Sequence, residues 1–197
     1  MRRDLEIIAD LINPGARVLD LGCGDGDLLR HLASAKGVNG YGIEKDADEI
    51  AICIRAGVNV IEHDLDDGLT RFPDSSFDMV VMTETLQAVA APERLLDEML
   101  RIGEECIVTF PNFGHWRCRM QLASRGRMPV ARHIPHSWYD TPNIHLCTFR
   151  DFEELVTGKG LPIIERFVVD ASYEKRVRWI PNLFGTIAFY RLGRARA

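Results

Sequence analysis

The residues whose types and spacing best suit binding chemistry run from Asp20 to Gly26, in the order DLGCGDG. Gly22, Gly24 and Gly26 predict a tight turn whose backbone a ligand can approach closely, because glycine has no Cβ to obstruct it. Asp20 ends the apolar run before the turn, where its carboxylate can face a positively charged group. The pattern therefore predicts a ligand-binding loop between a strand and a helix.

Two further carboxylates are spaced to join that loop. Glu44 ends a second apolar run, where it can accept hydrogen bonds from both hydroxyls of a ribose. Asp64 follows a third run, where it can meet the exocyclic amine of a base. Either carboxylate alone also fits an ordinary surface residue, but together with the glycine turn they indicate a nucleoside-type ligand.

Charge narrows the choice of ligand. The dinucleotide pattern GxGxxG requires glycine at position 27, which is Asp27 here. Asp25 and Asp27 place negative charge where a pyrophosphate would need a positive helix N-terminus. This disfavours NAD and favours S-adenosylmethionine, which carries an ammonium and a sulfonium, or its product S-adenosylhomocysteine. Cys23 has no base near it in sequence, so it fits a small buried filler better than a nucleophile.

An alternation of strands and helices must position these residues. Apolar, β-branched runs predict strands at 16–21, 40–44, 58–63, 77–83 and 106–110, and helical spacing predicts helices at 4–12, 27–35, 46–56, 92–102 and 149–157. Two extended stretches, 162–170 and 183–191, follow without a clear helix between them. We expect an α/β fold with a doubly wound, mostly parallel Rossmann-like sheet and an antiparallel edge strand.

A long insertion, residues 111–148, separates the fifth strand from the next helix, where connections of about 2–6 residues are usual. No acidic residue occurs from Cys106 to Tyr139. The insertion combines aromatic side chains with arginines, namely Phe113, Trp116, Trp138, Tyr139, Arg117, Arg119, Arg125, Arg127 and Arg132. Such a segment at the carboxyl ends of parallel strands is typical of a lid or partner-binding surface. The alternative is a short helical excursion with a solvated basic face.

The composition excludes several classes of protein. The 197 residues carry 24 Lys+Arg against 29 Asp+Glu, a net charge of −5 that argues against nucleic-acid binding. No apolar run reaches the roughly 18 residues that span a membrane. The five cysteines are scattered without metal-type pairing, so we expect reduced thiols and no metal site. These features predict a single cytoplasmic domain over residues 1–197.

Several longer motifs resemble known families. The segment VLDLGCGDGDLL looks like motif I of class I SAM-dependent methyltransferases. The more specific segments closely resemble the methionine biosynthesis protein MetW family; they are HDLDDGL at 63–69, SFDMVVMTETLQ at 76–87, FPNFGHWRCRMQL at 110–122, GRMP at 126–129 and WYDTPNIHLCT at 138–148. The resemblance runs from about residue 4 to residue 170.

The resemblance implies a role for each matching residue. The loop residues, Cys23 included, would surround the methionine part of SAM, and Glu44 would bind its ribose. Asp64 and Leu65 would contact the adenine, and the segment that begins at Thr83 would lie beside the sulfonium. No catalytic residue is assigned, because the DPPY-like element of amino-methylating enzymes is absent and Glu84, His115, His136 and His145 are all candidates for a base. His115 and His145 belong to the family-typical segments, and nothing chooses between these two.

The resemblance also implies a partner. MetW-like proteins occur beside homoserine O-acyltransferase, and a methyl-transfer activity of their own is not established for the family. The expected function is therefore that of a SAM- or SAH-binding partner or regulator of homoserine O-acyltransferase in methionine biosynthesis, with the insertion 111–148 as the contact surface. The alternative is an active SAM-dependent methyltransferase that acts on a small molecule.

Overall fold

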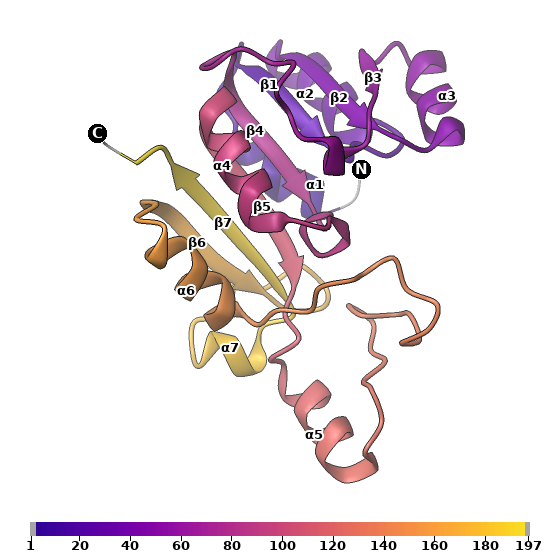
Figure 1. Ribbon diagram of the computed structural model, residues 1–197, viewed down its shortest axis with the longest axis vertical. Helices are drawn as coiled ribbons and strands as arrows, with labels where there is room; N and C mark the ends of the chain where they lie inside the picture. The colour runs from indigo at the N-terminus through magenta and orange to yellow at the C-terminus, as the bar shows by residue number, and fades with distance from the viewer. Residues whose placement is uncertain (1–2, 196–197) are drawn as a thin grey trace.

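The computed structural model describes residues 3–195, and its centre is a seven-stranded sheet in the order β3-β2-β1-β4-β5-β7-β6 (Figure 1). The strands are β1 (Arg17–Leu21), β2 (Asn39–Glu44), β3 (Val60–Glu62), β4 (Phe77–Thr83), β5 (Gly103–Pro111), β6 (Ile163–Val169) and β7 (Ile187–Gly193). β7 runs antiparallel to both β5 and β6, whereas the other neighbouring pairs are parallel. This confirms the predicted fold class. The antiparallel strand itself lies one place inside the edge, because β6 occupies the edge.

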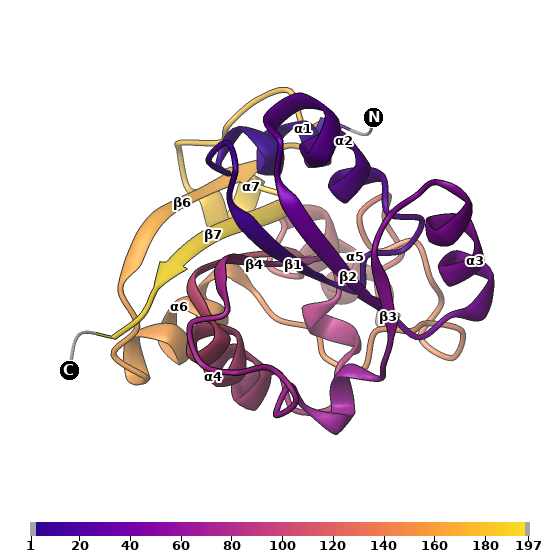
Figure 2. The same cartoon turned by 90° about the horizontal axis from the view of Figure 1, so that it is seen from above.

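Helices cover both faces of the sheet, as the view from above shows (Figure 2). They are α1 (Arg3–Asp10), α2 (Asp27–Lys36), α3 (Ala47–Arg55), α4 (Pro92–Ile102), α5 (Trp116–Arg125), α6 (Phe149–Gly158) and α7 (Pro181–Phe184), with 3-10 turns η1 (Leu65–Asp67) and η2 (Leu86–Ala88). Successive residues of β4 point to opposite faces. Met79 and Val81 pack with α1 and α2, and Val80 and Met82 pack with α4 and α6.

The elements predicted from periodicity match the structure closely in the first two thirds of the chain. The ranges 77–83 and 92–102 coincide with β4 and α4. The prediction of an extended stretch from Leu183 is wrong at its start, because α7 occupies residues 181–184. Pro181 supplies the φ of a first helical turn, and its carbonyl oxygen accepts from Gly185 N at 2.9 Å.

The insertion leaves the sheet at one buried side chain. Asn112 is completely buried, and its Nδ2 donates to the carbonyl oxygens of Asn182 and Gly185 at 3.1 and 2.9 Å. Its Oδ1 accepts from the backbone N–H groups of Gly114 and Phe149 at 3.0 and 3.2 Å. This amide therefore joins the end of β5 to the start of α6 and to the carbonyl groups of α7 and its C-cap.

Beyond that joint, the insertion contains a helix that stands away from the sheet. α5 projects from the body of the molecule (Figure 1), and Cys118 is its one buried residue. The helix begins at His115, whose Nδ1 accepts from Arg117 N at 3.3 Å, and ends at Gly126 in the left-handed conformation. The helical excursion is thus present in part of the insertion, and it presents apolar side chains as well as arginines to solvent.

Candidate functional site

The glycine loop follows β1 and is fixed to the neighbouring strand by its backbone. Gly22 N and Cys23 N both donate to the carbonyl oxygen of Ile43 in β2, at 2.8 and 3.0 Å. Gly22 and Gly24 have φ of 71° and 53°, in the left-handed region that favours glycine. A Cβ on Gly22 would lie 2.8 Å from Thr85 Oγ1, whereas one on Gly24 would project into open space. The loop therefore presents bare backbone to a cavity.

The first cavity beside the loop is strongly acidic. It has a volume of about 240 Å³, and its polar lining includes Asp20, Asp25, Asp27, Glu49 and Thr83. Within residues 3–195, three buried oxygens in this lining have no hydrogen-bond partner, namely Asp20 Oδ1, Glu49 Oε2 and Thr83 Oγ1. Buried acceptors of this kind are costly unless a donor meets them. The chemistry of the cavity therefore suits a cationic hydrogen-bond donor such as an ammonium group.

Asp20 is the centre of this electrostatic arrangement. Its side chain is 3 % exposed, and burial, together with the nearby charge of Glu44, raises its pKa to about 7. Ionised Asp20 is poorly solvated here, so a cation placed beside its carboxylate would be strongly stabilised. A group with a perturbed pKa at the wall of a cavity is typical of a functional site.

The second cavity lies on the other side of the loop and shares Gly22 with the first. It measures about 80 Å³, and Glu44, Asp64 and Leu65 are among the residues that line it. Asp64 caps η1 through Oδ1, which accepts from Asp66 N at 3.1 Å, and Oδ2 accepts from Lys45 Nζ at 3.2 Å. The backbone hydrogen bond and the lysine lower the pKa of Asp64, so it is a carboxylate at neutral pH.

Glu44 holds the loop in place as well as facing the cavity. Its Oε2 accepts from Gly24 N at 2.9 Å, and Oε1 accepts from Lys45 N and Asp46 N at 2.8 and 3.1 Å. Oε1 therefore has its two acceptor sites filled, whereas Oε2 retains capacity for a further donor, which leaves the predicted ribose contact possible. The sequence did not indicate the bond from Gly24 N, because it joins residues of different strand–turn units.

We expect Glu44→Ala to weaken the binding of SAM by about 1–3 kcal/mol, since hydrogen bonds to a charged group are lost and the loop is released. Isothermal titration measures the change. Glu62→Ala is the matched control, because Glu62 is the residue of β3 paired with Glu44 in register and is exposed. Unchanged affinity in Glu44→Ala would contradict the assignment of this carboxylate to the site.

Of the predicted site residues, Gly26 and Cys23 pack within the loop, and Cys23 also lines the first cavity. Gly26 lines neither cavity; a Cβ there would lie 2.9 Å from Cys53 Sγ, so glycine allows α2 to start against α3. Cys23 is buried, its sulfur lies where a Cβ of Gly42 would be, and burial and the charge of Asp20 raise its pKa. A neutral, packed thiol agrees with the interpretation of Cys23 as a filler.

Glu49, which lines the first cavity, and Tyr173, which contacts Glu84, were not identified from the sequence. Glu49 was not singled out because only the packing of α3 brings its side chain to the loop. Tyr173 lies far along the chain, between β6 and α7, yet its hydroxyl donates to Glu84 Oε1 at 2.7 Å. Glu84 itself has φ of 51°, unusual for a residue with a side chain, and stands between Thr83 and Thr85, which line the first and second cavities.

The candidate histidines lie outside both cavities. His115 caps α5, and burial, with the charges of His133 and Arg117, lowers its pKa to about 4. His145 Nε2 is 3.2 Å from the carbonyl oxygen of Ala90, and His136 is exposed. His145 N and Ile144 N both donate to the carbonyl oxygen of Gln87, so the end of the insertion rests on η2 beside the second cavity.

Across residues 3–195, no group of three or more His, Cys, Asp or Glu side chains is arranged to hold a metal ion. In the same residues, no helix is long and apolar enough to cross a membrane. All five cysteines are free thiols.

The fold is shared with many methyltransferases. An S-adenosylmethionine dependent methyltransferase from Mesorhizobium loti superposes with a TM-score of 0.71 at 18 % identity, over 98 % of both chains. Phosphoethanolamine N-methyltransferase 2 from Haemonchus contortus, solved with S-adenosyl-L-methionine, superposes with a TM-score of 0.69 at 16 % identity, over 98 % of this chain and 52 % of that one. At such identities the likeness establishes the class I methyltransferase fold alone.

Sequence comparison establishes the family. The bifunctional methionine biosynthesis protein MetXA/MetW of Rhodopirellula baltica is 35 % identical over 205 residues, which cover 97 % of this chain and 33 % of that protein. The chain thus spans about a third of the length of this relative. The family model described as methionine biosynthesis protein MetW matches residues 2–192. The chain therefore belongs to the methionine biosynthesis protein MetW family.

Proposed function

We propose that this protein binds SAM or SAH at the glycine loop and acts as a partner or regulator of homoserine O-acyltransferase in methionine biosynthesis. The observation that carries the ligand is the buried carboxylate of Asp20, whose Oδ1 has no hydrogen-bond partner in the described residues. An anionic pyrophosphate would meet four carboxylates in this cavity, whereas the ammonium of SAM or SAH would neutralise part of their charge.

The proposed ligand fits the residues present. Asp20, Glu49 and Thr83 would receive its ammonium group, and Gly22 and Gly24 would leave room for its carbon chain. In the second cavity, Glu44 would bind the ribose, and Asp64 and Leu65 would face the adenine. SAM supplies an activated methyl group when it is bound, but the proposed role needs only its binding.

The relative from Rhodopirellula baltica supports the partner, because its name joins a MetXA and a MetW function in one protein. Two activities fused in one chain in one organism often belong to proteins that associate in another. We propose that residues 1–197 act as one domain and meet the acyltransferase through the insertion 111–148.

The surface of the insertion supports this contact. Trp138 and Tyr139 are 74 % and 75 % exposed, and Trp116 and Met120 of α5 are 41 % and 57 % exposed. The guanidinium of Arg117 lies 5.4 Å from the centre of the Trp116 ring. Trp, Tyr and Arg are the residues that most often dominate the binding energy of interfaces.

We expect Trp116→Ala and Arg117→Ala to weaken association with homoserine O-acyltransferase by at least about tenfold, as hot-spot truncations do. SAM affinity should be unchanged, because neither residue lines the two cavities. Surface plasmon resonance with immobilised acyltransferase and titration with SAM measure the two effects. Tyr41→Ala and Arg55→Ala are the controls, since both side chains lie on the β2–α3 side of the molecule and are exposed. If the Trp116→Ala and Arg117→Ala variants lose affinity for SAM but not for the acyltransferase, the insertion is a lid over the SAM site and not the contact surface.

Regulation requires that the ligand distinguish the free protein from its complex. If SAM binds the free protein and the complex with equal affinity, it does not change the equilibrium between them. Unequal affinities make complex formation depend on SAM. Acyltransferase activity measured with and without this protein, each with and without SAM, tests the proposal. Activity that is indifferent to both would overturn it.

The second candidate is methyl transfer to a small molecule. The observation in its favour is Glu84, which a hydrogen bond from Tyr173 holds in a strained backbone conformation between the two cavity-lining threonines. A carboxylate fixed in this way could accept a proton from an acceptor substrate. Release of SAH above background with pathway intermediates, abolished in Glu84→Gln, would favour this activity.

A further inference from the structure

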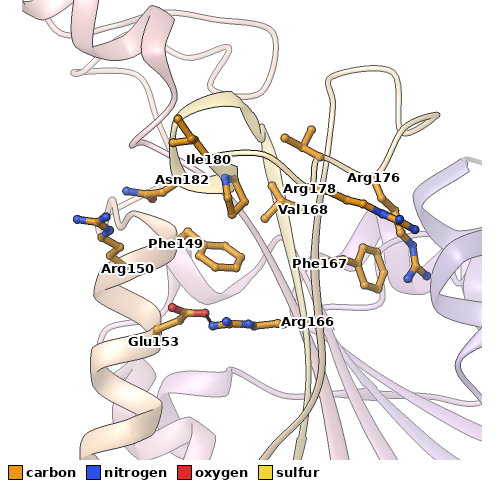
Figure 3. Close-up of a pocket in the computed structure, with 12 residues that line it drawn as sticks. Phe149, Arg150, Glu153, Arg166, Phe167, Val168, Arg176, Arg178, Ile180 and Asn182 are labelled. Carbon is orange, nitrogen blue, oxygen red and sulfur yellow. Dashed lines mark ion pairs between the residues drawn. The ribbon is translucent and has the colours of Figure 1, made fainter.

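A third cavity opens at the other end of the sheet, between α6, β6 and the loop that precedes α7 (Figure 3). Its volume is about 460 Å³, and its lining shares no residue with the two cavities beside the glycine loop. None of the functions discussed above uses it.

The lining of this cavity is positively charged in a protein that is negative overall. Four arginines and one carboxylate are among the residues that line it, namely Arg150, Arg166, Arg176, Arg178 and Glu153. Arg166 pairs with Glu153, and Arg176 pairs with Glu165 at 3.2 Å. Within residues 3–195, neither Arg150 nor Arg178 has a carboxylate partner, so positive charge gathers without compensation.

Apolar and polar groups complete the cavity. Figure 3 shows Phe149 and Phe167 on separate walls, each beside an arginine. The guanidinium of Arg176 lies 3.8 Å from the centre of the Phe167 ring, and that of Arg166 lies 5.9 Å from the centre of the Phe149 ring. Asn182 is also in the lining, but its Oδ1 is buried beside Gly114 and has no hydrogen-bond partner in the described residues, so it is not offered to the cavity.

One residue in the lining of this cavity has a strained backbone conformation. Ile180 lines the cavity with φ of 41°, an outlier for a β-branched residue. Strain of this kind persists where the surrounding structure enforces it, and it gathers at binding sites.

We propose that this cavity binds a small polyanion, whose phosphate or carboxylate groups pair with the arginines, two of which lie over the phenylalanine rings. Guanidinium groups bind phosphate and carboxylate through paired hydrogen bonds, and several arginines favour more than one negative charge. A concave cavity with aromatic walls suits a small molecule better than a flat protein surface. The proposal is independent of SAM binding at the glycine loop.

Titration of the full chain with pyrophosphate and, separately, with malonate tests the proposal at physiological ionic strength. The double variant Arg150→Gln/Arg178→Gln should weaken binding of the preferred anion by at least about tenfold, because both uncompensated guanidinium groups are lost. The matched control is Arg125→Gln/Arg127→Gln, which removes two exposed arginines from the insertion and should change the affinity less than about twofold. The anion that binds with the higher affinity shows whether the natural ligand carries phosphate or carboxylate groups.

Two outcomes would overturn the proposal. The first is that neither anion binds the wild-type protein; if the Arg150→Gln/Arg178→Gln variant then also loses association with the acyltransferase, the arginines form a protein interface instead. The second is that the two double variants lose affinity equally, which would indicate diffuse attraction to positive charge. Arg178→Gln alone, in a loop, provides a second variant, and unfolding temperatures of all variants establish that each one folds.

Discussion

Replacing Asp20 by asparagine is expected to weaken SAM binding roughly a hundredfold at about pH 8, as loss of a buried charge partner does, and to remove its pH dependence. In the wild type, the pKa of Asp20 is raised to about 7 by burial and by Glu44. A ligand ammonium pairs with the carboxylate form, so affinity should fall roughly tenfold between about pH 8 and about pH 6 as the carboxylate takes up a proton. Above that range it should level off.

Although Asp20→Asn should weaken SAM binding, it should make the ligand-free protein more stable at about pH 8. The folded-state pKa of Asp20 lies above the value of about 3.9 expected for an unfolded chain. Between these two pKa values the folded state holds a proton that the unfolded state has lost, so this residue's contribution to stability falls as the pH rises towards 7. We therefore expect Asp20→Asn to unfold at a higher temperature than the wild type at about pH 8, with a smaller difference near pH 4.

Isothermal titration across this pH range and thermal unfolding without ligand measure the two effects. Asp25→Asn is the matched control, because Asp25 lines the same cavity but is exposed, and its variant should retain the pH dependence. If wild type and Asp20→Asn show the same slope of affinity against pH, Asp20 is not the residue that receives the cation. SAH, which shares the ammonium but lacks the sulfonium, should show the same slope as SAM.

Asn112→Ala is expected to lower the free energy of unfolding by about 3–5 kcal/mol, because it leaves two buried carbonyls and two buried N–H groups without partners. For a chain of this size that corresponds to roughly a 10 °C fall in the unfolding temperature. The affected groups lie in the loop after β5, at the start of α6 and in α7 and its C-cap, so the root of the insertion should loosen first. Chemical denaturation and hydrogen exchange measure both effects.

Asn59→Ala is the control for this prediction. Its amide makes one exposed hydrogen bond, to the carbonyl oxygen of Gly40 at 3.3 Å, and its loss should cost less than about 1 kcal/mol. If the insertion contacts the acyltransferase, Asn112→Ala should also weaken that association while SAM affinity changes little. A variant as stable as the wild type would show that water or a backbone shift replaces the bonds of Asn112.

Local patterns in the sequence were enough to predict most of the strands and helices. The apolar run at 77–83 and the helical spacing at 92–102 specify β4 and α4, because burial leaves a period of 2 or 3.6 in the order of residues. The glycine loop was predictable for the same reason, since a turn between a strand and a helix needs residues that accept positive φ. The placement of three carboxylates at the carboxyl ends of successive strands also follows from order alone, because parallel strands end at one edge of the sheet.

What the sequence by itself determined is therefore the fold class, the family and the edge of the sheet at which the proposed ligand site lies. Only the tertiary structure decided that β7 enters between β5 and β6, that Asn112 joins three elements, that Glu49 and Thr83 leave buried oxygens beside Asp20, and that four arginines surround a separate cavity. Each of these features depends on which distant residues become neighbours. A pattern of burial shows that a side chain has a partner, but the identity of that partner is set only when the whole chain packs.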